Sequence, residues 1–105
     1  MAEDRMPDAE YRIISTNYIY LRDNLHAGLL TGHLHQYGVL SHDDLEEIHN
    51  KAEISRKAGV ELLLNKLHFV GGCSAFKHFV ESLKANGYHR AVELLEVNIT
   101  CYVTR

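Results

Sequence analysis

The sequence predicts an all-α protein that folds as a six-helix antiparallel bundle. Apolar residues recur at intervals of three and four along most of the 105-residue chain, and this spacing places them on one face of a helix. The chain has one proline and seven glycines, which leaves long segments without a helix breaker. The connections between the periodic segments span only a few residues, which is typical of neighbouring antiparallel helices.

The first helix is expected over about residues 9–25. Its apolar face consists of Ile14, Tyr18, Leu21 and Leu25. The middle of this segment, Ser15-Thr16-Asn17, carries side chains that compete for backbone hydrogen bonds. We therefore expect the first helix to be bent or broken there.

Two further helices follow, with recognisable ends. The second is expected over about residues 26–37, with one stripe formed by Leu30, Leu34 and Tyr37. It ends at Gly38, a residue suited to the left-handed turn after a helix. The third is expected to start at about His42, because Ser41 and Asp44 form a capping-box pair.

The last three helices carry the strongest apolar pattern. The fourth covers about residues 54–68, with Val60, Leu63, Leu64 and Leu67 at helical spacing. Ser74 is expected to cap the fifth helix, which has Phe76, Phe79, Val80 and Leu83 on one face and stops at Asn86-Gly87. The sixth covers about residues 89–98, and the remaining tail has no clear period. We expect the centre of the core to contain Leu63, Leu64, Phe76 and Phe79.

Composition and charge exclude several classes of protein. Hydrophobic residues make up 46% of the chain and charged residues 24%, close to the averages of globular domains, so disorder is not expected. The formal net charge is −3, whereas nucleic-acid binding depends on clustered lysine and arginine. The sequence has neither an apolar leader nor a run of about 18 apolar residues. We expect a cytoplasmic protein that binds no nucleic acid and no membrane.

Residues that carry reaction chemistry do not form a recognisable motif. Cys73 and Cys101 are too few for a disulfide framework, and neither stands in a motif that supplies a catalytic base. We therefore expect no enzymatic activity and no catalytic residue.

The eight histidines raise the question of a metal site. His33 and His35 stand two residues apart, and His42 and His49 stand seven apart. Ligands on one helix face stand three or four residues apart. We therefore expect neither a metal site nor a cofactor.

Five short motifs follow one another in a defined order. They are LRDNL (21–25), LHQYGVLS (34–41), DDLEEI (43–48), SRKAGVELLL (55–64) and GCSAFKHFVESL (72–83). In order and spacing they resemble the first five helices of the caspase-recruitment domain (CARD), a member of the death-fold superfamily. The resemblance covers about residues 10–97. The Gly-Val-Leu-Ser turn, the basic start of the fourth helix and the Ala-Phe pair are similar to CARDs rather than to death domains or death-effector domains.

The resemblance implies a fold, a domain division and a function. The fold is the six-helix death fold with Greek-key topology, formed by residues 9–98, with a leader over 1–8 and a tail or the start of a linker over 99–105. CARDs are homotypic protein–protein interaction modules in apoptotic and innate immune signalling. The resemblance therefore implies that the chain binds CARD-containing proteins and itself. Head-to-tail contacts between two different patches propagate into oligomers or filaments.

The resemblance also implies which residues meet a partner. The most common contact in the family places a basic surface on helices one and four against an acidic surface on helices two and three. The matching basic patch is Arg12, Arg22, Arg56 and Lys57, and the matching acidic patch is Asp43, Asp44, Glu46 and Glu47.

Two alternatives stay open at this point. The acidic residues also suit a helix N-terminus, and both patches also fit an ordinary solvated face. The second function class is a small helical nucleic-acid-binding or regulatory domain of another bundle family.

Overall fold

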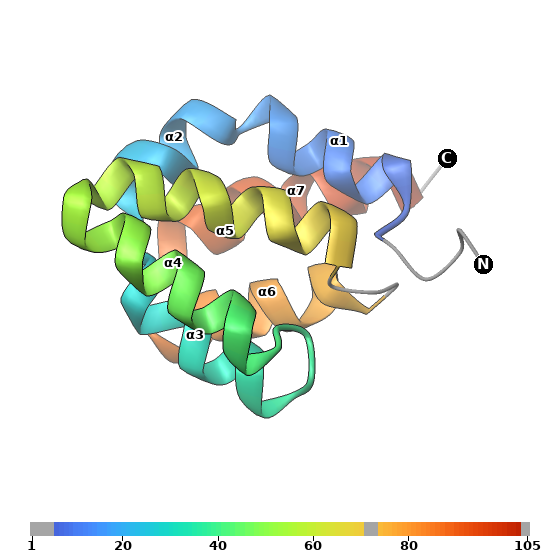
Figure 1. The fold of residues 1–105 in the computed structure, drawn as a ribbon. Coiled ribbons are helices and arrows are strands. Elements are labelled where there is room, and N and C mark those ends of the chain that lie inside the picture. The colour runs from blue at the N-terminus through green and yellow to red at the C-terminus, as the bar shows by residue number, and fades with distance from the viewer. Residues whose placement is uncertain (1–5, 71–73, 104–105) are drawn as a thin grey trace.

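A computed structural model describes residues 6–70 and 74–103, and side chains over 6–69 and 74–96. The described residues are helical with short connections and contain no strand, which confirms the predicted all-helical bundle. Figure 1 shows α5 crossing the middle of the molecule, with α1 and α2 on one side of it and α3 and α4 on the other. The helices are α1 (Asp8–Thr16), α2 (Tyr18–Asn24), α3 (Ala27–Gln36), α4 (His42–Ile54), α5 (Arg56–Val70), α6 (Ala75–Ala85) and α7 (His89–Val103).

The first predicted helix is divided into α1 and α2 at Asn17. This residue has φ −105° and ψ 16°, and its Nδ2 donates to the carbonyl oxygen of Ile13 at 3.0 Å. Oγ1 of Thr16 donates to the carbonyl oxygen of Arg12 at 2.9 Å. Side chains that bond back to the preceding turn compete with the helical ladder. The predicted break is confirmed, and its cause is the local polar sequence.

Two glycines end their helices as predicted. Gly38 after α3 has φ 78°, and Gly87 after α6 has φ 81°. At the end of α3, the amide of Val39 donates to the carbonyl oxygen of Leu34 at 2.9 Å, and the amide of Gly38 donates to that of His35 at 3.1 Å. This pair of bonds is the Schellman motif, which requires a left-handed residue and so favours glycine.

The helix starts agree only in part with the predicted caps. Ser41 forms the predicted capping box with Asp44 at the start of α4. The prediction for Ser74 is wrong: its backbone lies at φ −99° and ψ 7°, and its hydroxyl makes no capping bond. An N-cap side chain reaches the next turn from an extended backbone, which Ser74 lacks. Ser55 has that extended backbone, and its hydroxyl accepts from the amide of Ala58 at 3.3 Å at the start of α5.

The last helix is longer than the sequence pattern predicts. It reaches Val103, whereas the loss of apolar period suggested an end at about Asn98. No glycine or proline stands between these two positions, so nothing in the backbone forces the helix to stop. Loss of period is therefore a weaker stop signal than a breaker.

The core is formed by the predicted apolar faces. The four residues expected at its centre, Leu63, Leu64, Phe76 and Phe79, are each at most 2% exposed. Tyr37 does not belong to the core stripe of α3, because its side chain is 53% exposed. Met6, which the sequence pattern did not single out, is 1% exposed and packs in the core.

The helices α4 and α5 form a close antiparallel pair joined by one residue, Ser55. Their backbones approach so closely at Gly59 that a Cβ atom there would lie 2.7 Å from the Cβ atom of Ala52. The pairing places the start of α4 beside the later part of α5, which sets the position of the acidic residues described next.

Candidate functional site

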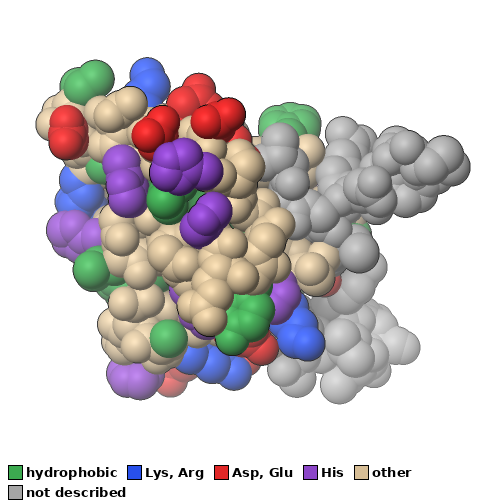
Figure 2. Space-filling model, turned by 60° about the horizontal axis from the view of Figure 1, so that its bottom comes forward, with side chains coloured by type: hydrophobic (Ala, Val, Ile, Leu, Met, Phe, Trp, Pro, Cys, Tyr) green, Lys and Arg blue, Asp and Glu red, His purple; other side chains and the backbone are tan. Residues whose placement is uncertain are grey.

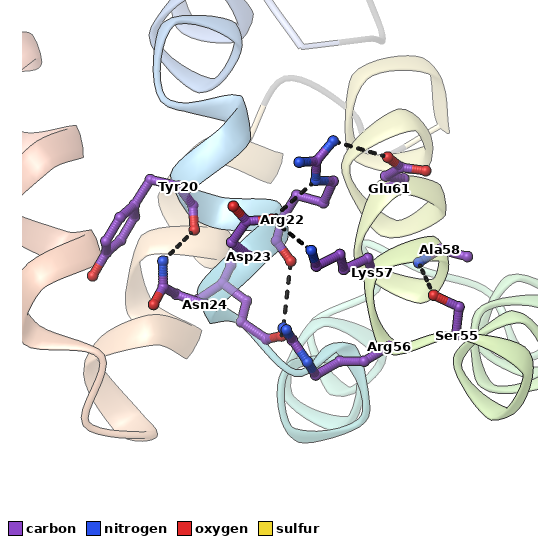
Figure 3. A network of polar contacts seen from close by, with 10 residues as sticks. Tyr20, Arg22, Asp23, Asn24, Ser55, Arg56, Lys57, Ala58 and Glu61 are labelled. Atoms are coloured by element: carbon purple, nitrogen blue, oxygen red, sulfur yellow. Dashed lines mark hydrogen bonds and ion pairs between the residues drawn. The ribbon is translucent and has the colours of Figure 1, made fainter.

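The end of α2 and the start of α5 bring three of the four predicted basic residues together (Figure 3). The side chain of Arg56 makes hydrogen bonds within the fold. Its Nη1 donates to the carbonyl oxygen of Leu25 at 2.9 Å and to that of Arg22 at 3.4 Å. A cation at the C-terminus of a helix satisfies free carbonyl groups and suits the helix dipole. Arg56 therefore caps α2 and fastens it to α5.

The other two basic residues of this group share carboxylate partners. Nε of Arg22 lies 3.1 Å from Oδ1 of Asp23, and Nζ of Lys57 lies 3.5 Å from the same oxygen. Nη1 of Arg22 lies 3.8 Å from Oε2 of Glu61. The hydrogen bond from Arg22 and the nearby Lys57 hold the pKa of the Asp23 carboxyl below its ordinary value.

This region is therefore mixed in charge rather than purely basic. We call it the α2–α5 surface; its charged residues are Arg22, Asp23, Arg56, Lys57 and Glu61. Three cations and two carboxylates leave a net charge of +1. Of the two cations that form ion pairs in this surface, Lys57 is the more exposed, at 54% of its side chain. It is the residue of this surface best placed to meet a partner.

The fourth predicted basic residue, Arg12, stands apart. It lies exposed on α1. Within the described ranges its side chain forms no hydrogen bond or ion pair with the α2–α5 surface. The structure thus does not join Arg12 to the other three by a direct contact.

The acidic residues lie in the first turns of α4, where Asp44 serves the fold. Its Oδ2 accepts from the amide of Ser41 at 3.2 Å, and its own amide donates to the Ser41 hydroxyl at 3.1 Å. Nζ of Lys66 on α5 lies 2.9 Å from Oδ1 of Asp44 and 2.7 Å from Oε1 of Glu47. The side chains of Asp44 and Lys66 are each only 17% exposed.

These contacts perturb both ends of the ion pair. Burial raises the pKa of the Asp44 carboxyl, but the hydrogen bonds from Lys66 and Ser41 lower it by more, so the pKa lies below its ordinary value. The hydrogen bonds to Glu47 and Asp44 raise the pKa of Lys66. The pair therefore remains charged around neutral pH and joins α4 to α5.

The remaining acidic residues face solvent. Asp43 is exposed and forms no ion pair with the described part of the chain. Glu46 is 65% exposed and lies 3.4 Å from Nε2 of His42, whereas Glu47 is 64% exposed. We call Asp43, Asp44, Glu46, Glu47 and Lys66 the α4 surface. Four carboxylates and one lysine leave a net charge of −3 when His42 is neutral.

The two surfaces share one helix, α5, and occupy different parts of it. The α2–α5 surface includes Lys57 in the first turn of α5, and the α4 surface includes Lys66 nine positions later. At 1.5 Å per residue the two lysines are separated by about 13 Å along the helix axis. Figure 1 shows the start of α5 and the start of α4 at opposite ends of this helix pair.

An apolar feature borders the α4 surface that sequence reasoning did not find. An open hollow of about 250 Å³ is lined by Glu47, Asn50, Lys51, Ile54 and Leu62. The Ile54 side chain is 80% exposed. A single exposed isoleucine at a helix end carries no periodic signal, so the sequence alone could not have singled it out.

The histidines are also arranged differently from the pairs considered in the sequence. Nδ1 of His35 lies 2.9 Å from the carbonyl oxygen of Leu40, and Nε2 of His49 lies 2.9 Å from Oγ1 of Thr31. Figure 2 shows histidines spread over the side formed by the lower part of Figure 1, several of them next to a group of acidic side chains. His33 does not pair with His35; it lies close to His78 and Glu81 of α6.

No protein-family model matches this chain, and no curated protein matches it at a significant level. No helix in the described ranges combines the length and the apolar character needed to cross a bilayer. Since neither comparison finds a match, the resemblance to CARDs rests on the sequence motifs alone.

Proposed function

We propose that the chain is a CARD-like homotypic interaction module of the cytoplasm, with no catalytic role. In this proposal the fold is the six-helix death fold, with α1 and α2 as its first helix, broken at Asn17. Its partners are CARD-containing proteins of apoptotic or innate immune signalling and further copies of itself.

One observation carries the proposal: surfaces of opposite net charge lie at opposite ends of the α4–α5 pair. The α4 surface has a net charge of −3 and the α2–α5 surface one of +1. Because the two patches differ, a contact between them leaves one patch free on each subunit, and such head-to-tail contacts propagate unless the ring closes. Complementary charge chiefly gives specificity and fast association.

The contacts within the fold decide which residues can test this proposal. Charge reversal of Asp44 or Arg56 would disrupt the capping box or the cap of α2, so lost assembly would not report on an interface. Asp43 and Lys57 are the better probes, because Asp43 has no described ion pair and Lys57 has one exposed, weak pair.

We predict that Asp43→Arg and Lys57→Glu each abolish concentration-dependent assembly while the helix content is retained. Each substitution places like charges across the proposed contact, which typically costs several kcal/mol. Light scattering over a concentration series reports assembly, and circular dichroism reports folding.

Two matched controls make equal changes in net charge elsewhere. Glu93→Arg on α7 and Lys77→Glu on α6 alter exposed residues outside both surfaces, and both should assemble like the wild type. If the two probe variants also assemble like the wild type, the electrostatic contact proposed here is wrong. Binding of DNA or RNA that weakens steeply with salt would instead favour the nucleic-acid alternative.

A further inference from the structure

Three side chains that suit a transition metal converge between α3 and α6. His33 comes from the last turn of α3, and His78 and Glu81 stand three residues apart on α6. One ligand atom from each lies within 4.8 Å of the others. The helices α3 and α6 pack against each other, so the convergence follows from the fold.

In the described part of the chain the two ring nitrogens in this cluster form no hydrogen bond, and the carboxylate near Nδ1 of His78 belongs to Glu81, itself a member of the cluster. Nε2 of His33 and Nδ1 of His78 are buried, and neither forms a hydrogen bond in the described part of the chain. Buried polar atoms are rarely left without a partner, because desolvation without a hydrogen bond is costly. Both nitrogens are therefore available as ligand atoms for a metal ion.

The spacing of the atoms fits tetrahedral coordination after a small adjustment. Nδ1 of His78 lies 3.3 Å from Oε1 of Glu81. Bonds of about 2.0–2.1 Å at the tetrahedral angle place two ligand atoms about 3.4 Å apart. The pair on α6 already has this separation, and rotation of the His33 side chain would need to close at most about 1.4 Å.

The Tyr37 ring lies against both imidazoles. Its ring centroid lies 4.8 Å from that of His33 and 4.9 Å from that of His78, with the His78 ring nearly parallel to it. This stacking restricts the orientation of the His78 ring, whereas the tilted His33 ring can still rotate toward the other two ligands. Tyr37, which lies outside the core, would therefore help to position a ligand of the site.

We propose that His33, His78 and Glu81 bind one Zn²⁺ ion between α3 and α6. Two imidazole nitrogens and one carboxylate oxygen form the His₂Glu donor set, which favours zinc and leaves a fourth position for water or another ligand. The ion joins two helices that are distant in sequence. This proposal does not depend on the charged surfaces described above.

The test is a zinc titration of the purified, reduced chain against a chromophoric competitor. We expect one tight equivalent of zinc. Cobalt in place of zinc should give the intense visible absorption of a four-coordinate site. Removal of any one ligand, by His33→Gln, His78→Gln or Glu81→Gln, should weaken zinc binding by at least about tenfold. Substitution of residues that only support metal ligands already lowers metal affinity by about that factor.

A matched control separates this site from adventitious histidine binding. His26 is exposed, and its side chain has no hydrogen bond or ion pair with the described residues, so His26→Gln should leave the affinity unchanged. Nitrogen NMR shifts of the His33 and His78 rings in the wild-type chain should change on titration, which needs no variant to fold. Absence of a saturable equivalent, or variants that bind zinc like the wild type, would overturn the proposal.

Discussion

At the scale of single residues, adjacent charges of the same sign have different roles. Asp44 caps α4 and pairs with Lys66, whereas its neighbour Asp43 is exposed and unpaired in the described ranges. Arg56 caps α2, whereas Lys57 faces solvent. The sequence identifies the charges but not this division, because the partners that decide it lie on other helices.

We predict that Asp44→Ala lowers the free energy of unfolding by about 1–2 kcal/mol, through loss of the capping box and the pair with Lys66. Asp43→Ala should change it by less than about 0.5 kcal/mol. Chemical denaturation at neutral pH measures both. Equal effects of the two substitutions would refute the role given to Asp44.

The Asp44–Lys66 ion pair also makes the free energy of unfolding depend on pH, in a direction that follows from the pKa of Asp44. The pKa of Asp44 is lower in the folded chain than its ordinary value. The contribution of the ionised Asp44 carboxylate to stability is therefore full above its pKa in the unfolded chain, about 3.9. This contribution is lost as the pH falls through the lower pKa of the folded chain. The stability difference between wild type and Asp44→Ala should accordingly shrink as the pH is lowered from about 5 to 2.

At the scale of helices, apolar periodicity and left-handed glycines were reliable guides. Both are local: a run such as Val60 to Leu67 buries one face whichever helices surround it, and Gly38 ends α3 through bonds to the preceding turn. The predicted cap at Ser74 was wrong, because an N-cap depends on the backbone angles of the residue as well as on its side chain. The close approach at Gly59 was also not foreseen, because it depends on how α4 and α5 cross.

We predict that Gly59→Ala destabilises the protein by about 1–3 kcal/mol, because the added methyl group would overlap Ala52 on α4. Gly32→Ala on α3 is the matched control. A Cβ atom there meets nothing within 4 Å, so the better helix propensity of alanine should stabilise by about 0.5–1 kcal/mol. A lower melting temperature for Gly59→Ala and a higher one for Gly32→Ala would support the close crossing of α4 and α5. A higher melting temperature for Gly59→Ala would contradict it.

At the scale of the whole molecule, the sequence predicted the helical bundle but not what the bundle brings together. Lys66 reaches Asp44, and His33 reaches His78, only after the helices have packed. Spacing along the chain therefore missed the candidate zinc ligands and overstated how basic the α2–α5 surface is. What remained visible in the sequence was the ordered set of motifs that resembles CARDs.

The most direct test of the proposed head-to-tail contact is to mix Asp43→Arg with Lys57→Glu. Each variant alone should remain monomeric by light scattering, since the α4 surface of one copy and the α2–α5 surface of the next then place like charges together at positions 43 and 57. In the mixture, Arg at position 43 of one variant faces Glu at position 57 of the other, and the unchanged Asp43 of the second variant faces the unchanged Lys57 of the first. Both junctions of an alternating chain are therefore complementary, while growth of either variant alone stays blocked. We expect alternating hetero-oligomers that grow with concentration as the wild type does; a mixture that stays monomeric, although both variants are folded and the wild type assembles, would contradict the pairing of these two surfaces.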